Sequence, residues 1–144
     1  MSKFSDWFDS QKFQHFSASE FESYFAAQRK GVKNSTPHRA LWKNIIPTLR
    51  IVDKLRESFG KPCQILSSYR SPAYNKAVGG APLSQHKEFI ALDIAFDGVS
   101  PQSVYDRLIE WRQQGKFSGG LGIYPTSGFV HIDTRGRNST WKGK

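Results

Sequence analysis

The chain has 144 residues, of which 38% are hydrophobic and 14% aromatic, and this composition indicates a folded protein with one sizeable core. No run approaches the roughly 18 apolar residues of a membrane span, and the first residues lack the apolar stretch of a secretory signal. The single cysteine excludes an intrachain disulfide and a cysteine-based zinc cluster, so we expect Cys63 to be a small buried hydrophobic residue. The net charge of +9 favours polyanionic surroundings, namely nucleic acid, anionic lipid surfaces or cell-wall polymers.

The first part of the chain, residues 1–30, is predicted to be a helical extension packed on a single domain that spans residues 1–144. Within it, residues 17–30 predict a short helix, because Ser17 or Ser19 can cap the helix and glutamates occupy its first turn. The stretch GVKNS that follows is expected to form a loop.

The main helix is predicted over residues 36–59. Thr36 can cap it, and the proline after Thr36 suits the first helical position. Pro47 removes one backbone hydrogen bond and is expected to kink the helix or split it in two, and Gly60 is expected to end it. Apolar residues recur at three- and four-residue steps, so one face is predicted to be buried: Leu41, Ile45, Leu49, Val52, Leu55 and Phe59.

Short strands and two helical segments are predicted for the rest of the chain. The predicted strands are residues 63–69, 83–96, 119–125 and 128–134, with a short helix or turn over 71–82 and an amphipathic helix over 100–115. Helices therefore come first and short strands mostly follow. This order predicts an α+β fold with a small, largely antiparallel sheet flanked by helices.

Ionisable side chains lie within two of these strands. The alternation of a strand places Asp93 on the same face as Phe89, and His131 on the same face as Asp133. Burying such groups is costly unless they are paired or bound to a metal. If the two strands are neighbours, His86, Asp93 and His131 offer two nitrogens and one oxygen, the ligand set of a catalytic zinc site. The alternatives are an Asp93–arginine ion pair and a histidine satisfied within the core.

The stretches SSYRSPAYNKAVGGAPLSQHKEFIALDI and GGLGIYPTSGFVHIDTRG resemble the family of zinc D-Ala-D-Ala carboxypeptidases, in particular its small phage and bacterial branch. The resemblance covers roughly residues 16–141, and its specific part runs from Ser67 to Asp133. It rests on a Tyr-Arg turn, a Ser-x-His, an aspartate seven residues beyond that histidine and a late histidine on a strand, in this order. The resemblance implies a sheet that carries a zinc site, as in D-Ala-D-Ala carboxypeptidase and hedgehog-like folds.

Residue by residue, the resemblance implies that His86, Asp93 and His131 hold one zinc ion per chain. Arg70 matches the arginine that contacts the substrate and stabilises charge near the scissile carbonyl. Ser84 matches a serine that lines the pocket. A structural salt bridge for Arg70 and a turn position for Ser84 are the alternatives. Tyr124 is a further substrate-binding candidate, and Asn75 a weaker one.

Two positions depart from the family pattern. Phe89 stands where the family usually has glycine, so it is expected to reroute the loop or cover the pocket. Gly128 stands where many members have the acid that serves as the general base. Asp133 is the candidate for that role, although it can equally orient a ligand. Glu88 and Tyr124 are lesser candidates.

The leading hypothesis from the sequence is a zinc peptidase that hydrolyses peptidoglycan stem or crosslink peptides. The bond cleaved is the terminal D-Ala-D-Ala bond, an interpeptide crosslink or the L-Ala-D-Glu link of some phage lysins. Without a visible signal peptide, we expect a monomer made in the cytoplasm that reaches the cell wall by release or export, as a phage-type endolysin does. The alternatives are an inactive zinc-stabilised wall-binding module and a basic nucleic-acid-binding protein.

Overall fold

The order of elements confirms the predicted α+β class. The computed structural model describes residues 3–144, and none of the described helices is long and apolar enough to cross a membrane. The elements are α1 (Lys3–Ser10), α2 (Ala18–Phe25), β1 (Gln28–Arg29), β2 (Val32–Lys33), the 3-10 helix η1 (Arg39–Asn44), α3 (Ile45–Phe59), β3 (Cys63–Ser67), α4 (Pro72–Ala77), the 3-10 helix η2 (Gln85–Glu88), β4 (Ala91–Phe96), α5 (Pro101–Gln113), β5 (Gly120–Tyr124), β6 (Phe129–Asp133) and β7 (Ser139–Lys142).

The strands β3 to β7 form one mixed sheet in the order β3-β4-β6-β5-β7. The first three pairings are antiparallel, as predicted, whereas β7 pairs with β5 in parallel. The sequence did not predict β7, because its residues, STWK, have neither an apolar run nor a clear alternation. A second, two-stranded sheet joins β1 and β2, where a longer helix and a loop were expected.

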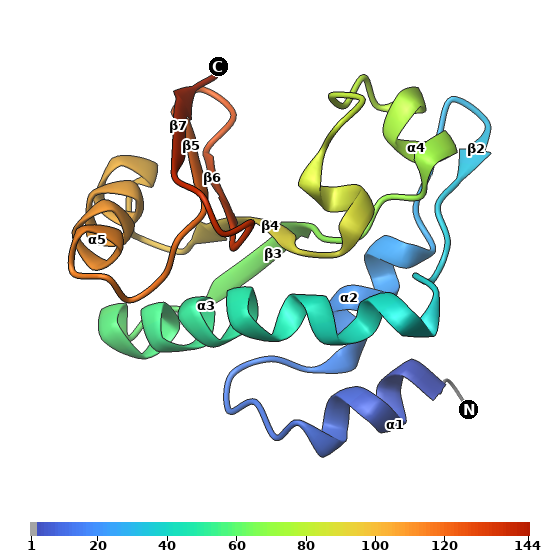
Figure 1. Cartoon of the computed structure of the whole chain (residues 1–144), viewed down its shortest axis with the longest axis horizontal. Coiled ribbons are helices and arrows are strands. Elements are labelled where there is room, and N and C mark those ends of the chain that lie inside the picture. Colours follow the sequence, from blue (N-terminus) through green and yellow to red (C-terminus); the bar gives the residue numbers. More distant parts are fainter. Residues whose placement is uncertain (1–2) are drawn as a thin grey trace.

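The register of the sheet separates an apolar face from a polar one. Leu92 of β4 pairs with Ile132 of β6, and Ile132 pairs with Leu121 of β5. These side chains are fully buried and share a hydrophobic core with α3 and α5. The opposite face carries Asp93 paired with His131. Figure 1 shows α3 across the middle of the molecule, with α1 below it and β5, β6 and β7 above it.

The main helix is shorter than predicted. Residues 39–44 form the 3-10 helix η1, and His38, not Thr36, caps it by accepting a hydrogen bond from the backbone of Ala40. The α-helix begins at Ile45, so Pro47 lies in its first turn, where a missing N–H costs no helical hydrogen bond. The predicted helix is therefore divided into a 3-10 segment and an α-helix, and the division lies before Pro47. Gly60 ends α3 in a left-handed conformation, as predicted.

The N-terminal helices contribute phenylalanines to the same core. A capping box fixes the start of α2, because Ser17 and the Glu20 side chain satisfy each other's backbone N–H groups. The rings of Phe4, Phe21 and Phe25 are buried, and Phe4 packs against the other two. The extension is thus part of the hydrophobic interior.

Phe89 packs with these phenylalanine rings in the core, and it does not line the cleft next to Asp93. It ends η2 in the left-handed conformation, with φ of 55° and ψ of 45°, and its side chain is 0% exposed. The rings of Phe21, Phe25 and Tyr69 surround it at centroid distances of 6.1, 5.8 and 6.3 Å. The expectation that Phe89 covers the pocket is therefore wrong: the backbone keeps the conformation that glycine favours, and it turns the ring into the core.

Cys63 is buried at the start of β3, as expected for a small hydrophobic residue. Burial, together with the negative charge of Glu20, raises the pKa of its thiol to about 12. The thiol is therefore neutral at physiological pH, which fits a packing role.

Candidate functional site

Three buried ionisable side chains meet on the polar face of the sheet. His86 comes from η2, Asp93 from β4 and His131 from β6, and they are 3%, 5% and 7% exposed. One ligand atom from each lies within 4.8 Å of the other two. His86 Nε2 is 3.2 Å from Asp93 Oδ2, and His131 Nδ1 is 3.1 Å from Asp93 Oδ1. The structure thus brings together the three residues that the sequence proposed as metal ligands.

Each imidazole is oriented by a hydrogen bond from its other nitrogen. The Nδ1 atom of His86 donates to the Ser68 carbonyl at 2.7 Å, which leaves Nε2 toward Asp93. The Nε2 atom of His131 lies 2.7 Å from Asp133 Oδ2, which leaves Nδ1 toward Asp93. Such partners fix the tautomer and the ring plane of a metal-binding histidine. The cluster therefore presents one free nitrogen from each histidine beside a carboxylate.

The electrostatics of the cluster favour an ionised carboxylate between two bases. Burial alone would raise the pKa of Asp93, but His86 and His131 outweigh it and hold that pKa below its usual range. Burial would lower the pKa of His131, but its hydrogen bonds to Asp133 and Asp93 raise it overall. Two imidazole nitrogens and one carboxylate oxygen match zinc in both number and chemical type. The donor set present therefore fits this metal.

Asp133 is fully buried behind His131, and both of its carboxylate oxygens are engaged. Oδ1 accepts hydrogen bonds from the backbone N–H groups of Gly120 and Arg135 and from Arg135 Nε. Oδ2 accepts from Arg135 Nη2 and lies against His131 Nε2. Burial would raise the pKa of Asp133, but Arg135 and His131 outweigh it and lower it. The carboxylate is held on the far side of the His131 ring from Asp93.

Arg70 lies beside the cluster and is held by other side chains. Its Nη2 atom is 3.6 Å from Asp93 Oδ2, its Nε donates to the Tyr24 hydroxyl at 3.2 Å, and its Nη1 donates to Asn75 Oδ1 at 3.3 Å. Asn75, a weaker pocket candidate from the sequence, therefore supports Arg70. The contact with Asp93 also fits the alternative of a structural ion pair. Arg70 therefore has a buried partner and lies next to the candidate metal ligands.

A cleft of about 490 Å³ opens over the cluster, and we call it the metal cleft. Ser84 lines it, with its hydroxyl accepting a hydrogen bond from the backbone N–H of His86 at 3.2 Å. Tyr124 lines it from β5. Glu88 is exposed and lies outside the lining. Among the described residues that line the metal cleft, Asp93 is the only carboxylate.

Trp141 of β7 forms part of the metal cleft and was not predicted. Its ring centroid lies 4.9 Å from that of His131, and its Nε1–H donates to the Tyr124 hydroxyl at 2.8 Å. Gly122 makes room for it, because a Cβ atom there would lie 2.2 Å from Trp141 Nε1. Arg135 packs against the same indole, 5.6 Å from its centroid. The only available signal was a tryptophan in a basic tail, whose pairing with β5 the sequence does not reveal.

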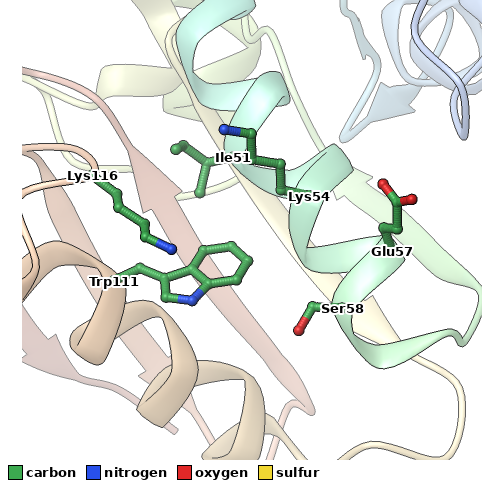
Figure 2. A pocket seen from close by; sticks show the side chains of 6 residues that line it. All are labelled: Ile51, Lys54, Glu57, Ser58, Trp111 and Lys116. Atoms are coloured by element: carbon green, nitrogen blue, oxygen red, sulfur yellow. The ribbon is translucent and has the colours of Figure 1, made fainter.

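A separate groove of about 490 Å³ lies between α3 and α5 (Figure 2). Ile51 and Lys54 line it from α3, and Trp111 lines it from α5. The Nζ atom of Lys116 lies 5.1 Å from the Trp111 ring centroid. This groove shares no lining residue with the metal cleft, and no group of potential metal ligands among the described residues lies in it. We therefore place the candidate site at the metal cleft.

A protein-family model and several curated proteins match this chain. The family model described as Peptidase M15 matches residues 14–133. The peptidoglycan L,D-endopeptidase MepK of Escherichia coli K12 is 35% identical over 79 residues, which cover 51% of this chain and 41% of that protein. The probable peptidoglycan L,D-endopeptidase MepK of Haemophilus influenzae is 35% identical over 85 residues, which cover 56% of this chain and 42% of that protein.

The aligned region thus spans about two fifths of the length of these curated relatives. No solved structure is significantly similar to the chain. The family match covers most of the sequence, including all three residues of the buried cluster, and it confirms the resemblance on which the sequence analysis relied. The chain belongs to the peptidase M15 family.

Proposed function

We propose that this protein is a zinc-dependent peptidase that hydrolyses peptidoglycan stem or crosslink peptides at the cell wall. The observation that carries the proposal is the buried cluster of His86, Asp93 and His131 at the floor of an open cleft, with Arg70 beside it. The names of the relatives support the substrate, because both are peptidoglycan endopeptidases. The net positive charge then favours association with an anionic cell wall. All three residues of the cluster come from one chain, so a monomer has the complete site.

His86 Nε2, a carboxylate oxygen of Asp93 and His131 Nδ1 would hold one zinc ion. When bound, zinc supplies Lewis-acid activation of water and of a scissile carbonyl. Arg70, fixed by Tyr24, presents its guanidinium at the edge of the same cleft, where it stabilises the negative charge that develops on the carbonyl oxygen. Ser84 starts η2 and so fixes the backbone of His86.

Asp133 has two candidate roles, general base and orienting partner of His131, and its contacts support the second. Its oxygens already accept hydrogen bonds from Arg135 and Gly120 and face His131 Nε2, and it does not line the metal cleft. As the orienting partner, it keeps the proton of His131 on Nε2 and leaves Nδ1 free for the metal.

Asp133→Asn is expected to lower zinc affinity about 10- to 100-fold, because an amide of the same shape no longer favours the required tautomer of His131. Competition with a chromogenic chelator measures the affinity, and hydrolysis at saturating zinc measures the remaining activity. Normal zinc affinity with strongly reduced turnover would instead assign Asp133 to proton transfer.

Tyr124 is proposed to donate a hydrogen bond to the substrate. The Trp141 indole can only donate, so the Tyr124 oxygen accepts from it and keeps its own proton for another acceptor. The Tyr124 ring stacks on Phe129 at 4.4 Å, which fixes its direction. The hydroxyl is therefore oriented at the wall of the metal cleft.

Tyr124→Phe is expected to reduce kcat/KM about fivefold, the effect of losing one neutral hydrogen bond of about 1 kcal/mol. Zinc content should stay at that of the unmodified protein. Trp141→Phe should have a smaller effect, and the double variant should be no worse than Tyr124→Phe, because both changes act on one hydroxyl. Losses that simply add in the double variant would show that Trp141 does not act through Tyr124.

Mass spectrometry of purified peptidoglycan after incubation with the zinc-loaded protein tests the proposed function. New fragments that disappear with a chelator and return with added zinc would support it, and their masses identify the bond. The first bond to examine is an L,D linkage, since both relatives are L,D-endopeptidases by name.

The second candidate function is an inactive, zinc-stabilised wall-binding module. The observation that favours it is the lack of a second carboxylate among the described residues that line the metal cleft. Phe89 no longer supports it, because this side chain lies in the core. Unchanged peptidoglycan that nevertheless sediments with zinc-loaded protein would favour the binding module over the peptidase.

A further inference from the structure

A further groove, distinct from the one between α3 and α5, adjoins the metal cleft. It has a volume of about 540 Å³, and we call it the flank groove. The two share Arg70, Val78, Asp93 and Phe129 in their linings, so Asp93 lies where they meet. A peptide whose reacting bond lies over the cluster therefore has room on both sides of that bond.

The N-terminal extension and a bulge in β3 build the flank groove. Arg29 lies on β1, and the β1–β2 hairpin contacts α4 at the right of Figure 1. The register between β3 and β4 shifts between Ile65 and Ser67, so Leu66 has no partner there. Leu66 is 42% exposed and lines the groove. A bulge of this kind re-aims a side chain next to a functional site.

The charge of the flank groove is positive. Arg29 is exposed, and within the described part of the chain its guanidinium forms no hydrogen bond or ion pair with another side chain. Arg29 and Arg70 both act on the Tyr74 hydroxyl, where they oppose the rise in pKa that burial causes. Among the described residues that line the flank groove, Asp93 is the only acid, and the two histidines and a metal bound to the cluster would offset its charge.

We propose that the flank groove binds a free carboxylate of the substrate peptide, with Arg29 as the residue that recognises it. This proposal rests on the proposed function and adds a preference for acidic over amidated stem peptides. A guanidinium binds a carboxylate through two parallel hydrogen bonds, and the exposed apolar face of Leu66 suits the neighbouring aliphatic part of the peptide. Arg70 does not provide this site, because Tyr24, Asn75 and Asp93 hold its guanidinium beside the cluster, where the proposed function assigns it to the scissile carbonyl.

The test compares two synthetic peptides, L-Ala-γ-D-Glu-L-Lys-D-Ala with free carboxylates and the same peptide with its carboxylates amidated. Calorimetric titration of the zinc-loaded protein measures binding, and mass spectrometry after each titration measures cleavage. The acidic peptide should bind about tenfold more tightly, as expected for one charge-assisted hydrogen-bonded pair at a partly exposed site. Arg29→Gln should remove this preference, and Arg29→Lys should restore part of it.

Lys30→Gln is the matched control, because it removes the same charge from the next residue of the hairpin, outside the lining of the flank groove. It should keep the preference. Equal affinity for the two peptides, or a preference that survives Arg29→Gln, would overturn the carboxylate site and leave the peptidase proposal intact. Binding of neither peptide, together with unchanged peptidoglycan in the digestion experiment, would overturn both proposals.

Discussion

Asp93→Ala is expected to abolish stoichiometric zinc binding and hydrolysis together. The carboxylate lies between the two histidines and is the only acid in the cluster, so its loss leaves two nitrogens and no negative charge to offset the metal. Loss of the several kcal/mol of transition-state stabilisation that a metal supplies lowers kcat/KM on the order of a thousandfold or more. Metal analysis after gel filtration and fragment release from peptidoglycan measure the two effects.

Asp97→Ala is the matched control, since Asp97 follows the same strand but is exposed, and its carboxylate accepts a single long hydrogen bond from the Gln64 side chain. It should retain one zinc ion per chain and normal activity. A chelator should lower the melting temperature of the Asp97→Ala protein and leave that of Asp93→Ala unchanged, because only a protein that binds the metal is stabilised by it. One zinc ion per chain in Asp93→Ala would place the metal elsewhere.

The alternation of the strands predicted the faces on which two of the three cluster residues lie, and the pairing of β4 with β6 brings those faces together. Within their strands, Asp93 lies on the same face as Ala91, and His131 lies on the same face as Phe129. The observed register pairs Asp93 directly with His131. His86 lies in η2, outside any strand, and no periodicity relates it to the sheet. His86 was a candidate ligand as a histidine shortly before Asp93, and the family resemblance supported that assignment. Spacing alone does not encode the contacts that fix the fold of a loop.

The roles of residues around the cluster depend on tertiary contacts that the sequence does not reveal. Strand alternation predicted that Asp133 lies on the same face of the strand as His131. The hydrogen bonds that Arg135 and Gly120 donate to the Asp133 carboxylate appear only in the folded chain. Trp141 lies on a four-residue strand that pairs in parallel with β5, after a turn rich in glycine and arginine. Such a pairing carries a weak local signal, since long-range contacts decide it.

The misplacement of Phe89 has a specific physical cause. Counting back from Asp93 in steps of two places Phe89 on the metal face, but this count holds only within a strand, and β4 begins at Ala91. The left-handed residue at the end of η2 changes the direction of the chain and of the side chain. The phenylalanines of α1 and α2 supply the packing that accepts the ring, so this position depends on the N-terminal extension.

Phe89→Gly is expected to destabilise the protein without increasing its activity. Removal of a fully buried phenylalanine costs about 3–5 kcal/mol of unfolding free energy, and relief of the left-handed conformation returns about 1 kcal/mol. Urea unfolding of the zinc-loaded protein should therefore show a net loss of about 2–4 kcal/mol. Phe89→Ala should be less stable than Phe89→Gly by about 1 kcal/mol, because alanine keeps the backbone strain and glycine removes it.

The rate per folded molecule should stay unchanged in Phe89→Gly, because the ring lies outside the metal cleft and touches Phe4, Phe21, Phe25 and Tyr69. Higher activity with unchanged stability would mean that the ring covers the cleft in solution and does not pack in the aromatic core. The comparison with Phe89→Ala separates the two contributions, since the cavities of the two variants differ by only one methyl group and their main difference is how readily the backbone adopts a positive φ.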